Sequence, residues 1–146
     1  MSNHTTFKIR CRAIILHEGK LLVVKHRPES SHYALPGGHM EPGEDVRECV
    51  RREIVEELGV EPTLGRLLYV HTFTDKDTLQ SVEFFFEVKN PQEFLDIEGL
   101  ARTHAHELHE IRWVAPSEDI KIRPETVTQD FATGTLLSDE IRYTKG

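Results

Sequence analysis

A helical segment with carboxylates on its apolar face constrains this chain more than any other feature. Residues 44–58 contain good helix formers, begin with acidic residues and are followed by Gly59, a common helix stop. One stripe of the helix is apolar and consists of Val46, Val50, Ile54 and Leu58. Glu53 and Glu57 fall on or beside that stripe, one turn apart. Like charges at this spacing repel and are costly to bury, so the segment requires a compensating cation.

The residues around this helix indicate which cation is expected. Pro36-Gly37-Gly38 precedes the helix and offers open backbone to a bound ion. Hard oxygen ligands in an incomplete cage are the usual way to hold Mg²⁺ or Mn²⁺ that also contacts phosphates. A plainer interpretation stays open, in which this is an ordinary amphipathic helix whose glutamates are solvated or pair with Arg47, Arg51 and Arg52.

The spacing of glycines and charged residues extends the pattern from Gly38 to Val60. Gly38 is followed after five residues by Glu44, and after seven more by Arg52-Glu53-Ile54-Val55-Glu56-Glu57-Leu58-Gly59-Val60. This segment resembles the Nudix box, G-x5-E-x7-R-E-U-x-E-E-x-G-U with U a bulky aliphatic residue, at every specified position. Leu35-Pro36-Gly37-Gly38 is similar to the usual lead-in of that family. The resemblance identifies the family and leaves the subfamily open.

The resemblance implies a fold and an activity. Nudix proteins are α/β/α sandwiches around a mixed β-sheet, and the box forms a loop-helix-loop. Most hydrolyse a nucleoside diphosphate linked to another group, and small MutT-like members remove modified nucleoside triphosphates. We therefore expect an α/β (α+β) fold and a Mg²⁺-dependent pyrophosphohydrolase, with Mn²⁺ as the alternative ion, in which metal-activated water attacks phosphorus.

The box also implies a role for each of its charged residues. Arg52 would orient the glutamates by ion pairing, with Glu44 as its expected partner. Glu56 would be a metal ligand or would hold metal-bound water, and the backbone carbonyl of Gly37 or Gly38 would complete the metal shell. The resulting candidate metal ligands are Glu53, Glu57, Glu56 and Gly38, and the candidate catalytic residues within the box are Glu56, Glu53 and Arg52.

A carboxylate must also accept the proton of the attacking water. It is either a box glutamate or, as in several family members, a residue of a loop close to the strand that carries Trp113. Glu107 is the first candidate there, before Glu110 and Glu98. The neighbouring histidines have no zinc-protease spacing, so a mobile polar substrate loop is favoured over a structural zinc site; they are His104, His106 and His109.

Four residues outside the acidic set are candidates for substrate binding. Arg27 could meet a phosphate, and Tyr33 could stack on a base or simply pack. His39 lies inside the box loop and either touches phosphate or is exposed. Phe85 belongs either to a strand core or to one wall of a substrate pocket.

The remaining pattern predicts strands first and helices inserted between them, which is typical of mixed α/β layers. We treat residues 1–146 as one domain, because single domains commonly have about 100–200 residues. The expected strands span 9–16 and 21–24, joined as a hairpin, then 67–73, 82–88 and 111–114; a short extended piece covers 33–35, a polar irregular stretch covers 91–109, and a second helix covers 124–133.

Charge and composition limit the partners. The net charge of −7 argues against stable nucleic-acid binding, which requires a basic footprint. Residues 38–60 hold seven acidic residues against three basic ones. Much of the negative charge is therefore concentrated at one candidate cation site, and a metal ion bound there would attract a diphosphate substrate. No membrane segment or signal peptide is recognisable, and two cysteines are too few for a disulfide framework. The expected location is the cytoplasm, and a homodimer is a further expectation from the family.

Two other classes of function stay open. One is a hydrolase of a non-nucleotide pyrophosphate, such as an isoprenoid or inositol compound. The other is a ligand-sensing module that keeps the fold without turnover, which the intact set of glutamates disfavours. The base, the bond that is cut and the leaving group are not readable from the sequence.

Overall fold

Two β-sheets form the centre of the molecule. The computed structural model describes residues 6–75, 79–96, 98–99 and 108–146. The larger sheet has the order β4-β1-β6-β5-β8, with the bounds β1 (Thr6–Ile14), β4 (Gly37–His39), β5 (Leu64–Asp75), β6 (Leu79–Val88) and β8 (Arg142–Lys145). The smaller sheet has the order β2-β3-β7, with the bounds β2 (Leu16–His17), β3 (Lys20–Lys25) and β7 (Glu110–Val114).

The larger sheet is mixed, as predicted. β1 runs parallel to β6 and β5 runs parallel to β8, whereas the β1–β4 and β5–β6 pairs are antiparallel. The predicted hairpin of 9–16 with 21–24 is wrong in its first strand. Only β2 pairs with β3, because the chain leaves the larger sheet at Ile15 and enters the smaller one. The strand β8 was not predicted, since its polar alternation carries no strong apolar signal.

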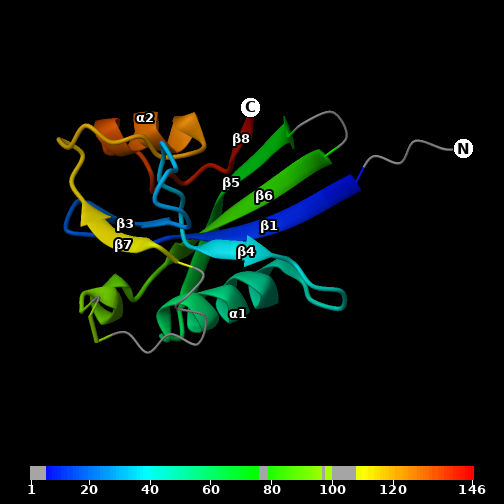
Figure 1. Cartoon of the computed structure of the whole chain (residues 1–146), viewed down its shortest axis with the longest axis horizontal. Helices are drawn as coiled ribbons and strands as arrows, with labels where there is room; N and C mark the ends of the chain where they lie inside the picture. The colour runs from blue at the N-terminus through cyan, green and yellow to red at the C-terminus, as the bar shows by residue number, and fades with distance from the viewer. Residues whose placement is uncertain (1–5, 76–78, 97, 100–107) are drawn as a thin grey trace, which may run out of the picture.

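One helix covers each face of the larger sheet, which confirms the predicted α/β/α arrangement (Figure 1). α1 (Val46–Leu58) packs on one face through Cys49, Val50 and Ile54. α2 (Glu125–Thr133) lies over the other face through Val127 and Phe131. A short 3-10 helix (Pro91–Phe94) follows β6. Among the described residues, no helix has the length and hydrophobicity to cross a membrane.

The alternation of side chains along β1 assigns each residue to one face of the sheet. Cys11 and Ala13 belong to the apolar cluster beneath α1, whereas Arg10 and Arg12 point to the face that α2 covers and line a cleft there. Both cysteines are free thiols and buried, as expected. A strand with apolar residues on one face and arginines on the other therefore separates two different environments.

The start of α1 is fixed by a reciprocal cap. The side chain of Asp45 accepts a hydrogen bond from the Glu48 backbone N–H at 2.8 Å, and the Glu48 carboxylate accepts one from the Asp45 backbone N–H at 2.9 Å. At the other end, Gly59 is left-handed (φ 73°) and donates its N–H to the Val55 carbonyl, as its place after the helix predicts. These caps set the rotation at which the helix presents its glutamates.

Replacement of Asp45 tests this cap. We expect Asp45→Ala to lower the free energy of unfolding by about 1 kcal/mol, because the Glu48 N–H loses its acceptor. Asp45→Ser is the matched control, since a serine hydroxyl can accept the same bond and should retain most of the stability. Chemical denaturation of both variants measures the difference; equal losses in the two would contradict the cap as its cause.

Candidate active site

The glycines of β4 let the helix carboxylates approach the sheet closely. Glu57 is 3% exposed and accepts a hydrogen bond from the Gly37 backbone N–H at 3.0 Å. Gly38 faces Glu53 so closely that an added Cβ would lie 2.3 Å from Glu53 Oε2. Gly37 has φ +147° and its missing side chain would collide with the Cys11 carbonyl oxygen. A side chain at Gly37 would therefore collide with the backbone, whereas one at Gly38 would displace the Glu53 carboxylate.

A single arginine connects the acidic residues. Arg52 donates from Nε and Nη2 to the two oxygens of Glu44, at 2.6 and 3.0 Å, so the expected ion pair is present. Its Nη1 donates to Glu53 Oε1 at 2.9 Å and to Glu56 Oε2 at 3.2 Å. Its Nη2 also donates to the His39 carbonyl oxygen at 3.0 Å. The guanidinium fork thus ties the loop before α1 to two turns of the helix.

The electrostatics of this network keep both partners charged. The hydrogen bond from Arg52 lowers the pKa of the Glu44 carboxyl below its usual range. The hydrogen bond to Glu44, followed by that to Glu53, raises the pKa of the Arg52 guanidinium. Arg52 therefore stays cationic at any pH at which the protein is folded, and it partly offsets the repulsion among the glutamates.

The donor set fits a hard divalent cation. The candidate ligands are the carboxylates of Glu53, Glu56 and Glu57 and the backbone carbonyl of Gly38. The Gly38 carbonyl oxygen also accepts a weak hydrogen bond from the Cys49 thiol at 3.8 Å. Each carboxylate has about four acceptor sites, so its hydrogen bonds to Arg52 or Gly37 leave it able to bind a metal. Within the described ranges, no three Asp, Glu, His or Cys side chains already form a metal cluster.

Gly38 offers a direct test of the close approach. We expect Gly38→Ala to displace the Glu53 carboxylate, because the new Cβ would occupy its position. The consequence is weaker Mg²⁺ binding, measured by titration calorimetry on the folded variant. The control is Gly19→Ala, which adds a methyl group at a turn where nothing lies within 4 Å. Gly19 has a φ of +78°, so alanine strains the backbone there, and this variant shows whether a loss of stability alone weakens Mg²⁺ binding. Unchanged Mg²⁺ affinity in Gly38→Ala would contradict the contact's importance.

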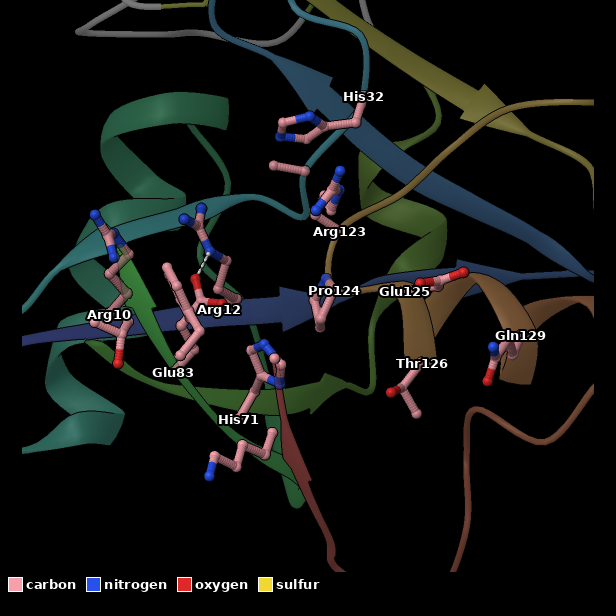
Figure 2. Close-up of a pocket in the computed structure, with 15 residues that line it drawn as sticks. Arg10, Arg12, His32, His71, Glu83, Arg123, Pro124, Glu125, Thr126 and Gln129 are labelled. Atoms are coloured by element: carbon pink, nitrogen blue, oxygen red, sulfur yellow. Dashed lines mark hydrogen bonds and ion pairs between the residues drawn. The ribbon is translucent and has the colours of Figure 1, made fainter. Parts of the chain in front are cut away.

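The acidic site, a small hollow and a large cleft lie next to one another. Nε2 of His26 lies 4.0 Å from Oε2 of Glu57. His26 and Arg27 line the hollow, which has a volume of about 180 Å³. The hollow shares His32 and Ala34 with a cleft of about 800 Å³ on the face of the sheet that α2 covers (Figure 2). The cleft is therefore adjacent to the hollow, and the hollow is adjacent to Glu57.

The predicted substrate residues lie in different surroundings. Arg27 is exposed beside His26 in the connecting hollow, and His39 is exposed at the end of β4. Tyr33 is 8% exposed, and its hydroxyl donates to Glu110 Oε2 at 2.8 Å, so packing is the alternative that the structure favours. Phe85 is fully buried against Tyr69 and has no exposed surface to offer a ligand in this structure.

Of the three general-base candidates outside the helix, Glu98 and Glu110 lie among the described residues. Glu107 lies outside the described residues, as do His104 and His106. Glu110 begins β7 and accepts the hydrogen bond from Tyr33. Glu98 is exposed in a turn. Neither Glu98 nor Glu110 forms a hydrogen bond with Glu53, Glu56 or Glu57, so the box glutamates stay the general-base candidates among the described residues.

Sequence reasoning missed the cleft residues. The arginines of β1 and Arg123, in the loop before α2, line the cleft, and His26 lies beside Glu57. A signal for Arg10 and Arg12 was available, because positively charged residues alternate with apolar ones from Lys8 to Ala13. Nothing local marks Arg123, which tertiary structure brings to the same place.

Fold and site together define a class of protein: a mixed-sheet sandwich that presents a capped, Glu-rich helix against a double-glycine strand. The sequence profile of the NUDIX domain matches residues 7–130. The chain belongs to the NUDIX family, and the predicted enzyme class, hydrolases of pyrophosphate bonds, is confirmed at the level of that family.

Named relatives share parts of the chain. An ADP-ribose pyrophosphatase of Methanocaldococcus jannaschii is 44% identical over 66 residues, which cover 44% of this chain and 39% of that protein's length. The CTP pyrophosphohydrolase of Escherichia coli strain K12 is 29% identical over 75% of this chain and 76% of its own. A putative 8-oxo-dGTP diphosphatase of Bacillus subtilis strain 168 is 29% identical over 70% of this chain and 63% of its own.

Solved structures agree with the fold. The ORF135 protein of E. coli superimposes with a TM-score of 0.67 at 25% identity, over 88% of this chain and 91% of its own. A MutT NUDIX hydrolase from Burkholderia pseudomallei superimposes with a TM-score of 0.69 over 86% of this chain and 97% of its own. At 23% identity, this second likeness concerns the fold alone.

Proposed function

We propose that this protein is a Mg²⁺-dependent pyrophosphohydrolase that cleaves a nucleoside diphosphate linked to another moiety, including modified nucleoside triphosphates. The observation that carries the proposal is the convergence of Glu53, Glu56 and Glu57 around one arginine and the double-glycine strand. The substrate class is supported by relatives that are named ADP-ribose pyrophosphatase, CTP pyrophosphohydrolase and putative 8-oxo-dGTP diphosphatase.

The residues of this chain divide the work of the reaction. Glu53, Glu56 and Glu57 would hold the divalent ions, which when bound neutralise the diphosphate and lower the pKa of water. Arg52 holds Glu53 and Glu56 in register and keeps their charge compensated. A box carboxylate accepts the proton of the attacking water, and the Gly37 N–H fixes the orientation of Glu57. Arg27 lines the hollow beside His26, where its guanidinium would contact phosphate oxygens of the substrate.

The proposal extends to location and assembly. Two buried free thiols support a reducing compartment, for which we propose the cytoplasm. The expected homodimer is checked by light scattering. No stable association with nucleic acid is expected at the net charge of −7.

A substrate panel tests the proposal. We expect phosphate, pyrophosphate or nucleoside monophosphate to be released from at least one of the panel members ADP-ribose, CTP, 8-oxo-dGTP and a sugar nucleotide with Mg²⁺, and no release after chelation of divalent ions. Readdition of Mg²⁺ or Mn²⁺ should restore the activity, which distinguishes metal loss from damage. Turnover that persists under chelation would contradict the metal requirement.

The same panel separates the two alternatives. Isoprenoid diphosphates and diphosphoinositol polyphosphates are included, because diphosphoinositol polyphosphate phosphohydrolase 2 of Mus musculus is 30% identical over 56% of this chain and 52% of its own. Exclusive turnover of such compounds would favour the non-nucleotide hydrolase. Tight binding without any turnover would favour the sensing module.

A further inference from the structure

The cleft on the α2 face carries a charge opposite to that of the whole protein. Four of its lining residues are cationic and two are acidic: Arg10, Arg12, Arg123 and Lys145 against Glu83 and Glu125. The balance stays positive when a terminal carboxylate on Gly146, which also lines the cleft, is counted. Because the chain as a whole has a net charge of −7, this excess is a local property of the cleft.

The cleft arginines come from two elements that are far apart in the sequence. Arg10 and Arg12 rise from β1 on the same side, and Arg123 comes from the loop that leads into α2 (Figure 2). Arg12 is held by Glu83, which accepts from Nε at 2.9 Å, and by the Leu35 carbonyl oxygen, which accepts from Nη1 at 3.1 Å. Arg10 donates to the Ser81 hydroxyl at 2.7 Å. Both β1 guanidinium groups are therefore positioned before any ligand arrives.

Both histidines of the cleft have lowered pKa values, and neighbouring cations contribute to the shift of His32. Burial lowers the pKa of His32, and the charges of Arg123, Lys121 and Lys25 lower it further. Burial also lowers the pKa of His71, whose ring stacks on Phe73 at a centroid distance of 5.6 Å. The two imidazoles are thus neutral at pH 7, and the fixed cations are the arginines and the lysine.

We propose that this cleft binds a phosphate group that the substrate carries in addition to the diphosphate that is cleaved. Arginine forks match the oxygens of a phosphate and form charge-assisted hydrogen bonds with them. His26, which lies beside Glu57, lines the hollow that shares His32 and Ala34 with the cleft, so the cleft and the box carboxylates are neighbours that one extended molecule would span. The substrate class is therefore a diphosphate whose far end is phosphorylated, on a sugar or on a polyol. This inference rests on the proposed pyrophosphohydrolase activity.

Matched substrate pairs that differ in a single phosphate test the inference. ADP-ribose is compared with its 2′-phosphate, and dephospho-coenzyme A is compared with coenzyme A. We expect the phosphorylated member of at least one pair to have a kcat/KM about tenfold or more higher, which corresponds to one charge-assisted hydrogen-bond set. Equal or lower kcat/KM for the phosphorylated member in all pairs would overturn the inference.

Variants assign the preference to the cleft. Arg10→Gln combined with Arg123→Gln should abolish the preference, chiefly through a higher KM for the phosphorylated member of each pair. The control is Arg66→Gln, which removes the same charge from an exposed ion pair with Asp139, outside the cleft. Thermal melts verify that all variants fold, and Arg123→Gln alone is the second variant because Arg123 is exposed. A preference that survives in the folded Arg123→Gln and double variants would contradict the assignment.

A binding experiment keeps the inference separate from catalysis. Adenosine 2′,5′-bisphosphate and AMP are titrated into the wild type and the double variant without divalent ions. We expect tighter binding of the bisphosphate by about tenfold in the wild type only. If no substrate is hydrolysed but this difference is present, the proposed activity fails and the phosphate site stands; hydrolysis with no difference in either experiment refutes the phosphate site alone.

Discussion

Glu57→Gln is expected to reduce kcat by more than about 100-fold, because loss of even an outer-shell partner of a metal ligand costs 10–100-fold. Glu57 is the most buried of the three helix carboxylates, and its Oε1 is fixed by the Gly37 N–H. The amide oxygen of glutamine can accept the same hydrogen bond, so the fold should persist while one negative charge at the metal site is lost. Activity with saturating Mg²⁺ and the affinity for Mg²⁺ are the two measurements.

Stability measurements sharpen this result. Without divalent ions, Glu57→Gln should melt at the same temperature as the wild type or higher, because repulsion between Glu53 and Glu57 is relieved. With Mg²⁺, the melting temperature of the wild type should rise, because a ligand that binds only the native state stabilises that state. The melting temperature of the variant should rise less, because its affinity for Mg²⁺ is expected to be lower. Glu61→Gln, at an exposed residue that pairs with Arg51, is the matched control. Equal activity in Glu57→Gln and the wild type would remove Glu57 from the metal site.

Arg52→Lys is expected to lower kcat by about 10–100-fold, the range found when a group that orients metal ligands is removed. Lysine keeps the charge, but one ammonium cannot span Glu44, Glu53 and Glu56 as the guanidinium fork does. The apparent affinity for Mg²⁺ should fall together with kcat, which identifies a positioning role. Arg51→Lys is the matched control, because Arg51 is an exposed neighbour whose partner is Glu61.

The pH dependence of stability gives a second readout for Arg52. Arg52 lowers the pKa of Glu44 from an ordinary value of 4.5, so their pairing stabilises the fold above that value. The contribution is lost as the pH falls through the lowered pKa of the folded state. The wild type should therefore melt above Arg52→Lys at neutral pH, and the gap should close under acidic conditions. A gap that is constant from pH 7 to below the Glu44 pKa would contradict this pairing as its origin.

The part of the site that lies on one helix was predictable from the sequence. Helical periodicity places Glu53 and Glu57 on the sheet-facing side, and the spacing of Glu44 to Arg52 matches the observed ion pair. Both helices also followed from the order of apolar segments and helix-stop residues. Local periodicity carries this information because each of these features depends on residues close together in the chain.

The cleft was not predictable because it depends on contacts distant in sequence. Arg12 reaches Glu83 through the parallel pairing of β1 with β6, and Arg123 joins them only through the packing of α2. For Tyr33 the sequence left both stacking on a base and packing open, and only the tertiary structure shows that its side chain is buried and that its hydroxyl donates to Glu110. Parallel pairing and loop placement leave no periodic mark in the sequence.

The position of β4 at the edge of the larger sheet has a consequence for how this protein can change. The carboxylates lie against one side of β4, where Gly37 and Gly38 place no side chain between the strand and the helix. The cleft opens on the other side of the sheet. Substitutions on the cleft side of β1, β5 and the loop before α2 can therefore alter which molecule is accepted without moving the groups that perform the chemistry. Selectivity and reactivity are separable traits in this architecture, and directed evolution for a new substrate should accumulate mutations on the α2 face alone.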